Sequence, residues 1–358
     1  MSIMKEENGT YTVQCRVKDW TGKTIHKKKR GFKRKKDAKL WEMEMLSQGN
    51  ILNVTLKDFF DIYLEDKKNS IKQRTVYNKC DVLRKHVFPY FGDRTMNSFK
   101  APELIKWQNE IIAMGYKPTY LNDIQKHFKA LFTHACKVYD LAENPFDKIE
   151  RMGKSEADEM LFWTIDEYNK FIAEIEPGTR HYVLFELLFW SGMRIGEALA
   201  LTKNDIDTIN YRVRINKTYY RKHKEDIITT PKTEQSIRTI DIPEFLVKEL
   251  ESYMSKLYGL QGDDRIFPIV AETVQHKMKR VILKNNLKVI RVHDLRHSHA
   301  AYLIEHGVQP LMIKERFGHK DIRVTLNTYG HLYPTKQKEL AQMLNAQREE
   351  GRKNGCEM

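Results

Sequence analysis

Apolar and polar residues alternate near the start of the chain and predict a small sheet. The alternating apolar positions are Tyr11, Val13, Cys15 and Val17. A period of two is typical of a half-buried strand, and residues 19–22 are typical of a turn into a second strand over residues 23–32. A helix with Ala38, Trp41 and Met45 on its inner face is expected next.

Helical spacing replaces this alternation over residues 55–149. Thr55 and Thr75 are expected to begin two helices, Pro102 to open a third, and a fourth to begin near Thr119. The pair Asn144-Pro145 ends the pattern. The segment therefore predicts a bundle of four helices.

The remaining pattern mixes helices and strands. Residues 150–160 are polar and predict a linker, after which Thr164 is the expected cap of a new helix. An apolar helix is expected over residues 182–190, with Arg194 at the start of the next. Strands are expected over residues 211–215, 226–230 and 236–240, which places Lys232 on a hairpin turn, and a last helix over about residues 338–347.

The net charge of the chain limits the classes of molecule that it is expected to bind. The 358 residues carry a net charge of +14, which favours a polyanion, either nucleic acid or an anionic membrane. The longest apolar run contains Glu186 and is far shorter than the roughly 20 residues of a membrane span. No apolar signal core opens the chain, so a cytoplasmic protein that does not bind membranes is expected. The scattered cysteines indicate neither a disulfide framework nor a zinc site.

The last part of the chain gathers residue types suited to phosphate chemistry. His293 and Arg296 are three apart and share a helix face, and Gly318-His319 and Tyr329 follow at a distance that suits one more helix. A guanidinium binds phosphate through parallel charge-assisted hydrogen bonds. A neighbouring tyrosine is a candidate nucleophile.

These motifs resemble the second half of the active site of tyrosine recombinases, the phage integrase family. The family also carries an upstream arginine in a Gly-Arg-x-x-Glu setting and a lysine between the two halves. Residues 191–199 read SGMRIGEAL and supply Arg194 and Glu197, and residues 230–238 read TPKTEQSIR and supply Lys232. The first fifty residues resemble the arm-binding domain of integrases from phages and conjugative transposons of Gram-positive bacteria.

The resemblance implies a mainly α fold with small β-sheets in three domains. An arm-type DNA-binding domain of a three-stranded sheet plus a helix would cover residues 1–50, and a four-helix core-binding domain residues 55–149. After a linker over residues 150–160, a mixed α/β catalytic domain with a C-terminal helix would cover residues 161–358. The first fifty residues carry 13 Lys and Arg against 6 Asp and Glu, which favours DNA binding over a merely solvated charged face.

The resemblance also implies a mechanism without metal or cofactor. Tyr329 would attack the scissile phosphate and form a 3′-phosphotyrosyl bond, with His293 as the base and Lys232 as the acid for the leaving 5′ oxygen. Arg194 and Arg296 would neutralise the nonbridging oxygens, His319 would donate a hydrogen bond to one of them, and Glu197 would orient Arg194. The expected catalytic set is Arg194, Lys232, His293, Arg296, His319 and Tyr329.

Several alternatives stay open at this point. Arg194 and Glu197 also fit an ordinary surface ion pair, and Tyr333 competes with Tyr329 as the nucleophile. His293 and His297 fit a metal site completed by a further histidine, either His299 or His319.

The predicted function is a site-specific DNA recombinase that integrates and excises a mobile element. Its expected partners are double-stranded DNA at core and arm sites and three further copies of the chain in a tetramer on DNA. An excisionase and host DNA-bending proteins are further candidates. The alternatives are a catalytically silent DNA-binding regulator, a metal-dependent phosphodiesterase and a type IB topoisomerase.

Overall fold

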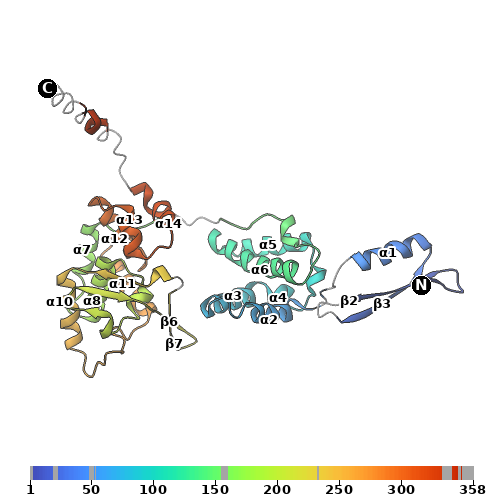
Figure 1. Cartoon of the computed structure of the whole chain (residues 1–358), viewed down its shortest axis with the longest axis horizontal. Helices are drawn as coiled ribbons and strands as arrows, with labels where there is room; N and C mark the ends of the chain where they lie inside the picture. Colours follow the sequence, from blue (N-terminus) through green and yellow to red (C-terminus); the bar gives the residue numbers. More distant parts are fainter. Residues whose placement is uncertain are drawn as a thin grey trace, which may run out of the picture. The chain divides into compact units, whose positions relative to one another are not determined.

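The computed structural model describes residues 3–18, 23–47, 52, 54–154, 160–231, 234–332, 341–345 and 348. The chain divides into two compact units, residues 1–158 and residues 159–358 (Figure 1). Helices predominate and the sheets are small and antiparallel, which confirms the expected fold class.

The first unit begins with a three-stranded antiparallel sheet. Its strands are β1 (Ile3–Lys5), β2 (Tyr11–Lys18) and β3 (Thr24–Phe32), in the order β1-β2-β3, and α1 (Lys35–Ser47) follows. Cys15 and Val17 are buried and pack with Trp41 of α1. Arg16, which alternates with them, is exposed on the other face of the sheet. The two strands and the helix predicted from the periodicity are confirmed as β2, β3 and α1. The additional strand, β1, pairs with β2 and completes the three-stranded sheet.

The helical part of this unit is built around a core of aromatic side chains. Its helices are α2 (Leu56–Lys67), α3 (Gln73–His86), α4 (Phe88–Phe91), α5 (Ala101–Ala113) and α6 (Pro118–Val138). The Thr55 side chain caps α2 by accepting from the backbone N of Asp58 at 3.2 Å, and Pro102 lies in the first turn of α5, both as expected. The second helix begins at Gln73, earlier than the expected Thr75, and a separate short helix, α4, follows it.

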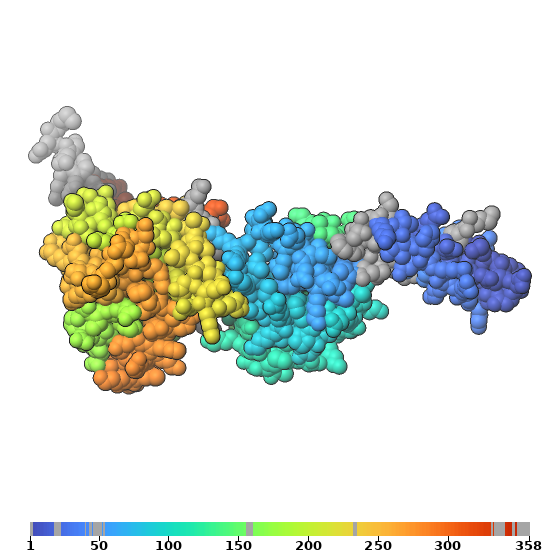
Figure 2. Space-filling view, turned by 90° about the horizontal axis from the view of Figure 1, so that it is seen from below, coloured from blue at the N-terminus to red at the C-terminus, as the bar shows by residue number. Residues whose placement is uncertain are grey.

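The second unit surrounds an apolar central helix. Its helices are α7 (Ile165–Ile172), α8 (Arg180–Ser191), α9 (Ile195–Ala198), α10 (Glu244–Ser255), α11 (Ala271–Lys284), α12 (Asp294–Glu305), α13 (Pro310–Phe317) and α14 (Ile322–Tyr329). Seven consecutive residues of α8, from Val183 to Phe189, are buried, and α8 packs against α10 and α12. Buried side chains of α8, α10 and α12 belong to one apolar core. The space-filling view shows the outer surface of this unit (Figure 2).

The buried position of α8 explains its long apolar run. Glu186, the one acid within it, accepts hydrogen bonds from Tyr168 at 2.7 Å and Trp190 at 3.0 Å, so its charge is satisfied inside the core. Across the ranges that the structure describes, no helix is long and apolar enough to cross a membrane.

The strands of the second unit form two separate sheets. The strands β4 (Ile206–Asp207), β5 (Arg212–Ile215) and β8 (Arg238–Asp241) make one, and β6 (Thr218–Lys222) pairs with β7 (Glu225–Thr229) in the other. The prediction that Lys232 lies on a hairpin between its two flanking strands is wrong, because those strands, β7 and β8, belong to different sheets. Val213 pairs with Ile240 and both are buried, which favours β5 as the partner of β8.

Candidate active site

The first candidate arginine lies at a sharp change of direction after α8. Gly192 ends that helix with a left-handed backbone (φ 66°), and Arg194 then caps α9, as predicted. Arg194 Nη1 donates to Glu197 Oε1 at 2.8 Å, and the backbone N of Arg194 donates to Oε2 of the same carboxylate at 3.0 Å. The Arg194 side chain remains 39% exposed, so its guanidinium reaches solvent while Glu197 holds one of its nitrogens.

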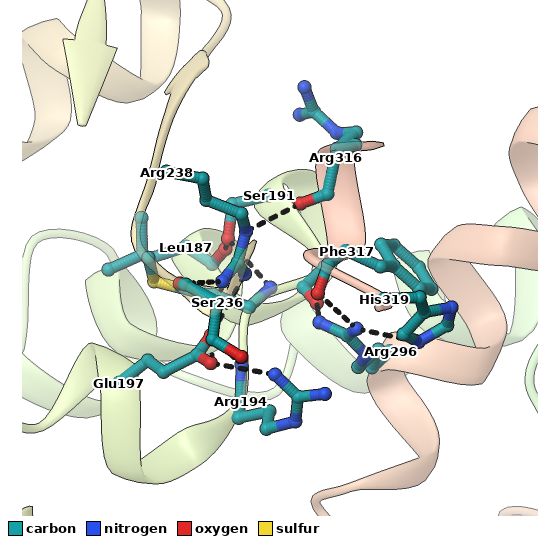
Figure 3. Close-up of polar contacts among 12 residues, drawn as sticks. Leu187, Ser191, Arg194, Glu197, Ser236, Arg238, Arg296, Arg316, Phe317 and His319 are labelled. Atoms are coloured by element: carbon teal, nitrogen blue, oxygen red, sulfur yellow. Dashed lines mark hydrogen bonds and ion pairs between the residues drawn. The ribbon is translucent and has the colours of Figure 1, made fainter. Parts of the chain in front are cut away.

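Glu197 is not part of an ordinary surface ion pair. Its side chain is 5% exposed and lies between the guanidinium groups of Arg194 and Arg238 (Figure 3). Burial would raise the pKa of Glu197, but the charge and hydrogen bonds of Arg238, together with the charge of Arg194, hold it at about 2. The carboxylate is therefore ionised at neutral pH and acts as the fixed anion between two cations.

The second candidate arginine, Arg296, is buried at the first turn of α12. Its Nη1 donates to the Gly192 carbonyl at 2.7 Å, and its Nη2 donates to the Phe317 carbonyl at 2.8 Å. The guanidinium also lies over the Phe317 ring, 3.8 Å from its centre. Burial, followed by the charge of Arg194, lowers the pKa of Arg296 to about 9. The group is still a cation at neutral pH, held in an orientation set by two backbone carbonyls.

His319 extends this cationic site. It follows Gly318, which ends α13 with a left-handed backbone (φ 64°), and its Nε2 lies 3.1 Å from Arg296 Nη2. Arginine can only donate, so Nε2 accepts here and Nδ1 carries the proton that Thr325 Oγ1 receives at 2.8 Å. Burial, followed by the charges of Arg296 and Arg194, lowers the pKa of His319 to about 3. The imidazole is therefore neutral at pH 7.

Tyr329, the candidate nucleophile, is the last residue of α14 and is 1% exposed. Its hydroxyl lies 2.8 Å from His297 Nδ1. Burial raises the pKa of Tyr329 to about 12, although the charges of Arg296 and Arg194 act in the opposite direction. The phenol is therefore protonated at neutral pH and needs a proton acceptor before it can attack.

His293, the histidine expected to be that acceptor, caps α12 and lies beside His297, with ring centres 5.4 Å apart. Burial, followed by the neighbouring His297 and Arg296, lowers the pKa of His293 to about 4. A neutral imidazole can accept a proton. In the described structure, however, the histidine that forms a hydrogen bond with the Tyr329 hydroxyl is His297.

The structure brings five of the six expected residues into the second unit around α8, α12, α13 and α14. They are Arg194, His293, Arg296, His319 and Tyr329. The sixth, Lys232, lies outside the described residues, as does Tyr333. The charge of Arg194 acts on the pKa of Arg296, His319 and Tyr329 alike.

Two residues of this site were missed from the sequence. His297 was considered only as a metal ligand and was given no step in the recombinase reaction, although its position next to Arg296 placed it one turn from His293. Arg238 closes the lysine-containing segment, and neither its spacing nor its neighbours indicated a partner. Its contact with Glu197 joins residues 41 apart in sequence.

The metal site considered above is not assembled by these histidines. In the part of the chain that the structure describes, no group of three or more His, Cys, Asp or Glu side chains lies close enough to hold a metal ion. His299 is buried, and its Nε2 accepts from Arg316 Nε at 2.9 Å. The ion pairs that the structure shows at the site join Arg194 and Arg238 to Glu197.

Comparisons with protein families match three separate parts of the chain. The Phage integrase family matches residues 162–336, which include the candidate site. The phage integrase N-terminal SAM-like domain matches residues 55–112, and the Arm DNA-binding domain matches residues 2–49.

Individual relatives extend these matches. The ICEBs1 integrase of Bacillus subtilis (strain 168) is 31% identical over an alignment of 366 residues, gaps included, that covers 96% of this chain and 99% of that protein. The transposase from transposon Tn916 of Enterococcus faecalis is 25% identical, over 70% of this chain and 67% of that protein.

Solved structures share the fold. The Tn1549 transposon integrase in complex with a circular intermediate DNA matches with a TM-score of 0.69 and 20% identity, over 82% of this chain and 99% of that one. A lambda integrase dimer bound to a COC′ core site matches with a TM-score of 0.58 and 19% identity, over 91% of this chain and 94% of that one. The family match over residues 162–336 and the 31% identity with a relative over nearly its whole length show that the chain belongs to the phage integrase family of tyrosine recombinases.

Proposed function

We propose that this chain is a site-specific DNA recombinase that cuts and rejoins DNA through a 3′-phosphotyrosyl bond on Tyr329, integrating and excising a mobile element. The observation that carries the proposal is the clustering of Arg194, Arg296 and His319, with Glu197 paired to Arg194 and with Tyr329 on the following helix. Two arginines against one carboxylate leave a positive site for an anion, and a scissile phosphodiester is such an anion.

The proposed reaction is a transesterification. The Tyr329 oxygen forms a bond to phosphorus as the bond from phosphorus to the 5′ oxygen breaks. The phenol proton passes to a base, and the leaving 5′ oxygen takes a proton from Lys232. A 5′ hydroxyl of a second strand then attacks the phosphotyrosine and releases the enzyme. Because one phosphodiester is exchanged for another, the proposal needs no nucleotide cofactor. It needs no metal ion either, because the arginines take over the charge neutralisation that metal ions supply in other nucleases.

The arginines supply electrostatic stabilisation in this scheme. Arg194 approaches the phosphate with the nitrogens that Glu197 leaves exposed, and Arg296 approaches it from its carbonyl-bound position. His319 donates to a nonbridging oxygen once its proton moves to Nε2, the nitrogen that now accepts from Arg296. An anion beside Arg296 favours that tautomer, because it takes the arginine N–H and leaves Nε2 facing a negative oxygen.

Two histidines are candidates for the base. His293 was expected from the resemblance, and its lowered pKa keeps it neutral and able to accept a proton. His297 has the shorter path, because its Nδ1 already lies 2.8 Å from the Tyr329 hydroxyl. Separate His293→Ala and His297→Ala variants distinguish them, since loss of the base reduces the rate of cleavage without removing DNA binding.

The proposed partner is double-stranded DNA, bound at core sites by the helical and catalytic domains and at arm sites by the N-terminal sheet. The exposed face of that sheet carries Arg16 on β2, and Gln14 pairs there with Lys28 of β3. A polar, basic sheet face suits phosphates and base edges of a groove. We further propose that four copies act together on two sites, because a reciprocal exchange of two duplexes requires four cleavages.

Covalent trapping tests this function. The full chain is mixed with nicked duplexes taken from the ends of the genetic element that carries its gene, in EDTA, and run on a denaturing gel beside the Tyr329→Phe variant. The proposal expects a protein–DNA band that survives EDTA and disappears in the variant. Tight binding without a band would favour a regulator, and cleavage only after metal is restored would favour a phosphodiesterase. Relaxation of supercoils on any sequence would favour a topoisomerase.

A further inference from the structure

A third arginine, outside the expected catalytic set, lies at the centre of the site. Arg238 begins β8, and its side chain is 7% exposed. Each of the three nitrogens of its guanidinium donates a hydrogen bond. Nε donates to the Arg316 carbonyl at 2.7 Å, Nη1 to the Ser236 carbonyl at 3.1 Å, and Nη2 to Glu197 Oε2 at 2.9 Å (Figure 3).

These acceptors belong to three segments that each lead to a candidate catalytic group. Glu197 holds the Arg194 guanidinium. The Arg316 carbonyl is next to the Phe317 carbonyl, which accepts from Arg296, and His319 follows two residues later. Ser236 closes the short 3-10 turn that follows the segment containing Lys232. One planar group therefore ties together parts of the chain that are remote in sequence.

The packing around Arg238 leaves little freedom for these segments. A Cβ atom built on Gly318 would lie 2.9 Å from the Gln235 carbonyl oxygen and 3.1 Å from Arg238 Cδ. The turn that leads to His319 therefore packs closely against Gln235 and Arg238. Only glycine fits at position 318, because its backbone is left-handed (φ 64°) and a Cβ atom has no room.

The sharing of Glu197 has a specific consequence for Arg194. Arg238 Nη2 binds Oε2, and its Nη1 lies 3.4 Å from Oε1, so the fork of Arg238 faces both oxygens of the carboxylate. Arg194 is left with a single side-chain bond, from Nη1 to Oε1. Without Arg238, Oε2 of Glu197 would keep only the hydrogen bond from the Arg194 backbone N and could also accept from the Arg194 side chain. A guanidinium readily closes onto a carboxylate with two parallel bonds.

We propose that Arg238 is a positioning residue that occupies Glu197 so that Arg194 keeps its remaining nitrogens for the scissile phosphate. Arg238 is too buried to contact DNA in this structure and acts through Glu197 and the backbone of its neighbours. The inference rests on the proposed function, since it gives Arg194 a phosphate to bind. Lysine is a poor substitute, because an ammonium group cannot reproduce the planar fork.

The test uses the trapping assay with two nicked duplexes, one with a normal scissile phosphate and one with a methylphosphonate, which lacks a nonbridging charge. Arg238→Lys and Arg238→Met are compared in the full chain with wild type. Arg180→Met is the matched control, because Arg180 is an exposed arginine at the start of α8. DNA affinity is measured in parallel by equilibrium binding.

On the normal phosphate, cleavage by Arg238→Met is expected to fall about 100-fold, the loss typical of one misplaced oxyanion donor, with DNA affinity little changed. Arg238→Lys is expected to lose about 10-fold, and Arg180→Met to match wild type. On the methylphosphonate, the deficit of both Arg238 variants should shrink to a few-fold, because the charge that Arg194 neutralises is absent.

A merely structural role gives a different result. If the folded Arg238→Lys variant loses the same factor on both substrates, or none on either, Arg238 does not act through the phosphate charge and the inference is wrong. Should Arg238→Met fail to fold, the lysine variant alone decides, because it keeps the positive charge. Absence of a covalent band with wild type on the normal phosphate would instead overturn the proposed function, and the inference with it.

Discussion

Replacing Glu197 by glutamine removes the negative charge that lies between Arg194 and Arg238 while keeping the shape of the side chain. The carboxylate accepts from Arg238 Nη2 at 2.9 Å, from Arg194 Nη1 at 2.8 Å and from the Arg194 backbone N at 3.0 Å. In Glu197→Gln one oxygen becomes an NH₂ group, which donates and cannot accept from either arginine. Two guanidinium groups are then left beside a neutral amide.

Two estimates of the cost agree. The pKa of Glu197 falls from its ordinary value of 4.5 to about 2, and at roughly 1.4 kcal/mol per unit the ionised form contributes about 3 kcal/mol to the free energy of unfolding at pH 7. Removing one partner of a buried ion pair typically costs about 3–5 kcal/mol. Glu197→Gln is therefore expected to destabilise the second unit by about 3 kcal/mol.

The effect has a definite pH dependence. Because the folded-state pKa is depressed, the contribution is fully present above the unfolded pKa of 4.5 and is lost as the pH falls towards 2. The difference between wild type and Glu197→Gln should be constant from pH 7 to 5.5. It should be smaller by about 1 kcal/mol at pH 3.5, where the unfolded carboxylate is mostly protonated.

Hydrogen exchange of the buried helix α8 measures this difference within the second unit alone. Glu251→Gln on α10 is the matched control, because Glu251 is exposed and the same change there should stay within about 0.5 kcal/mol. A difference below about 1 kcal/mol at pH 7 for Glu197→Gln would show that the charge does not hold the two arginines. So would a difference that is unchanged at pH 3.5.

Three further results are expected. Gly192→Ala should lower the free energy of unfolding by about 2–4 kcal/mol, because φ is 66° and the new Cβ would lie 2.6 Å from a Phe317 ring carbon; a shift below 1 kcal/mol in thermal or urea unfolding contradicts this. Thr164→Ala should cost about 1 kcal/mol in urea unfolding, because it removes the acceptor for the Glu167 backbone N at 3.3 Å; Thr164→Ser should restore it. His319 should remain neutral down to pH 5 in DNA-free protein, since its pKa is about 3, and an imidazole NMR titration with a midpoint near 6.5 would refute this.

The local elements were predictable because their signals are short-range. Alternation over eight residues identified β2, and hydroxyl side chains in the right place identified the caps of α2 and α7. Gly192 and Gly318 marked turns that the structure confirms, each with a left-handed backbone at a helix end. The turns that lead to Arg194 and His319 could therefore be placed from the sequence.

Pairings between remote residues were not predictable in this way. Alternation identified the strands on each side of Lys232 but not their partners, because the side chains of a strand report which face is buried and not which neighbour it meets. The contact of His297 with Tyr329 joins residues 32 apart, and Arg238 meets Arg316 across 78. Such contacts depend on how α12, α13 and the sheets pack together.

The candidate site holds mutually repelling cations close together, so it depends on the residues that keep these cations in position. Arg194, Arg238 and Arg296 lie close together with Glu197 among them, and burial, followed by the charge of Arg194, lowers the pKa of Arg296 to about 9. Cations confined in this way repel one another, so the DNA-free protein keeps an unfavourable arrangement that backbone carbonyls and Glu197 hold in place. A bound phosphate would relieve that repulsion at the point where charge develops in the transition state. Under the proposed function, the residues that hold the cations apart would therefore contribute to catalysis without touching the substrate.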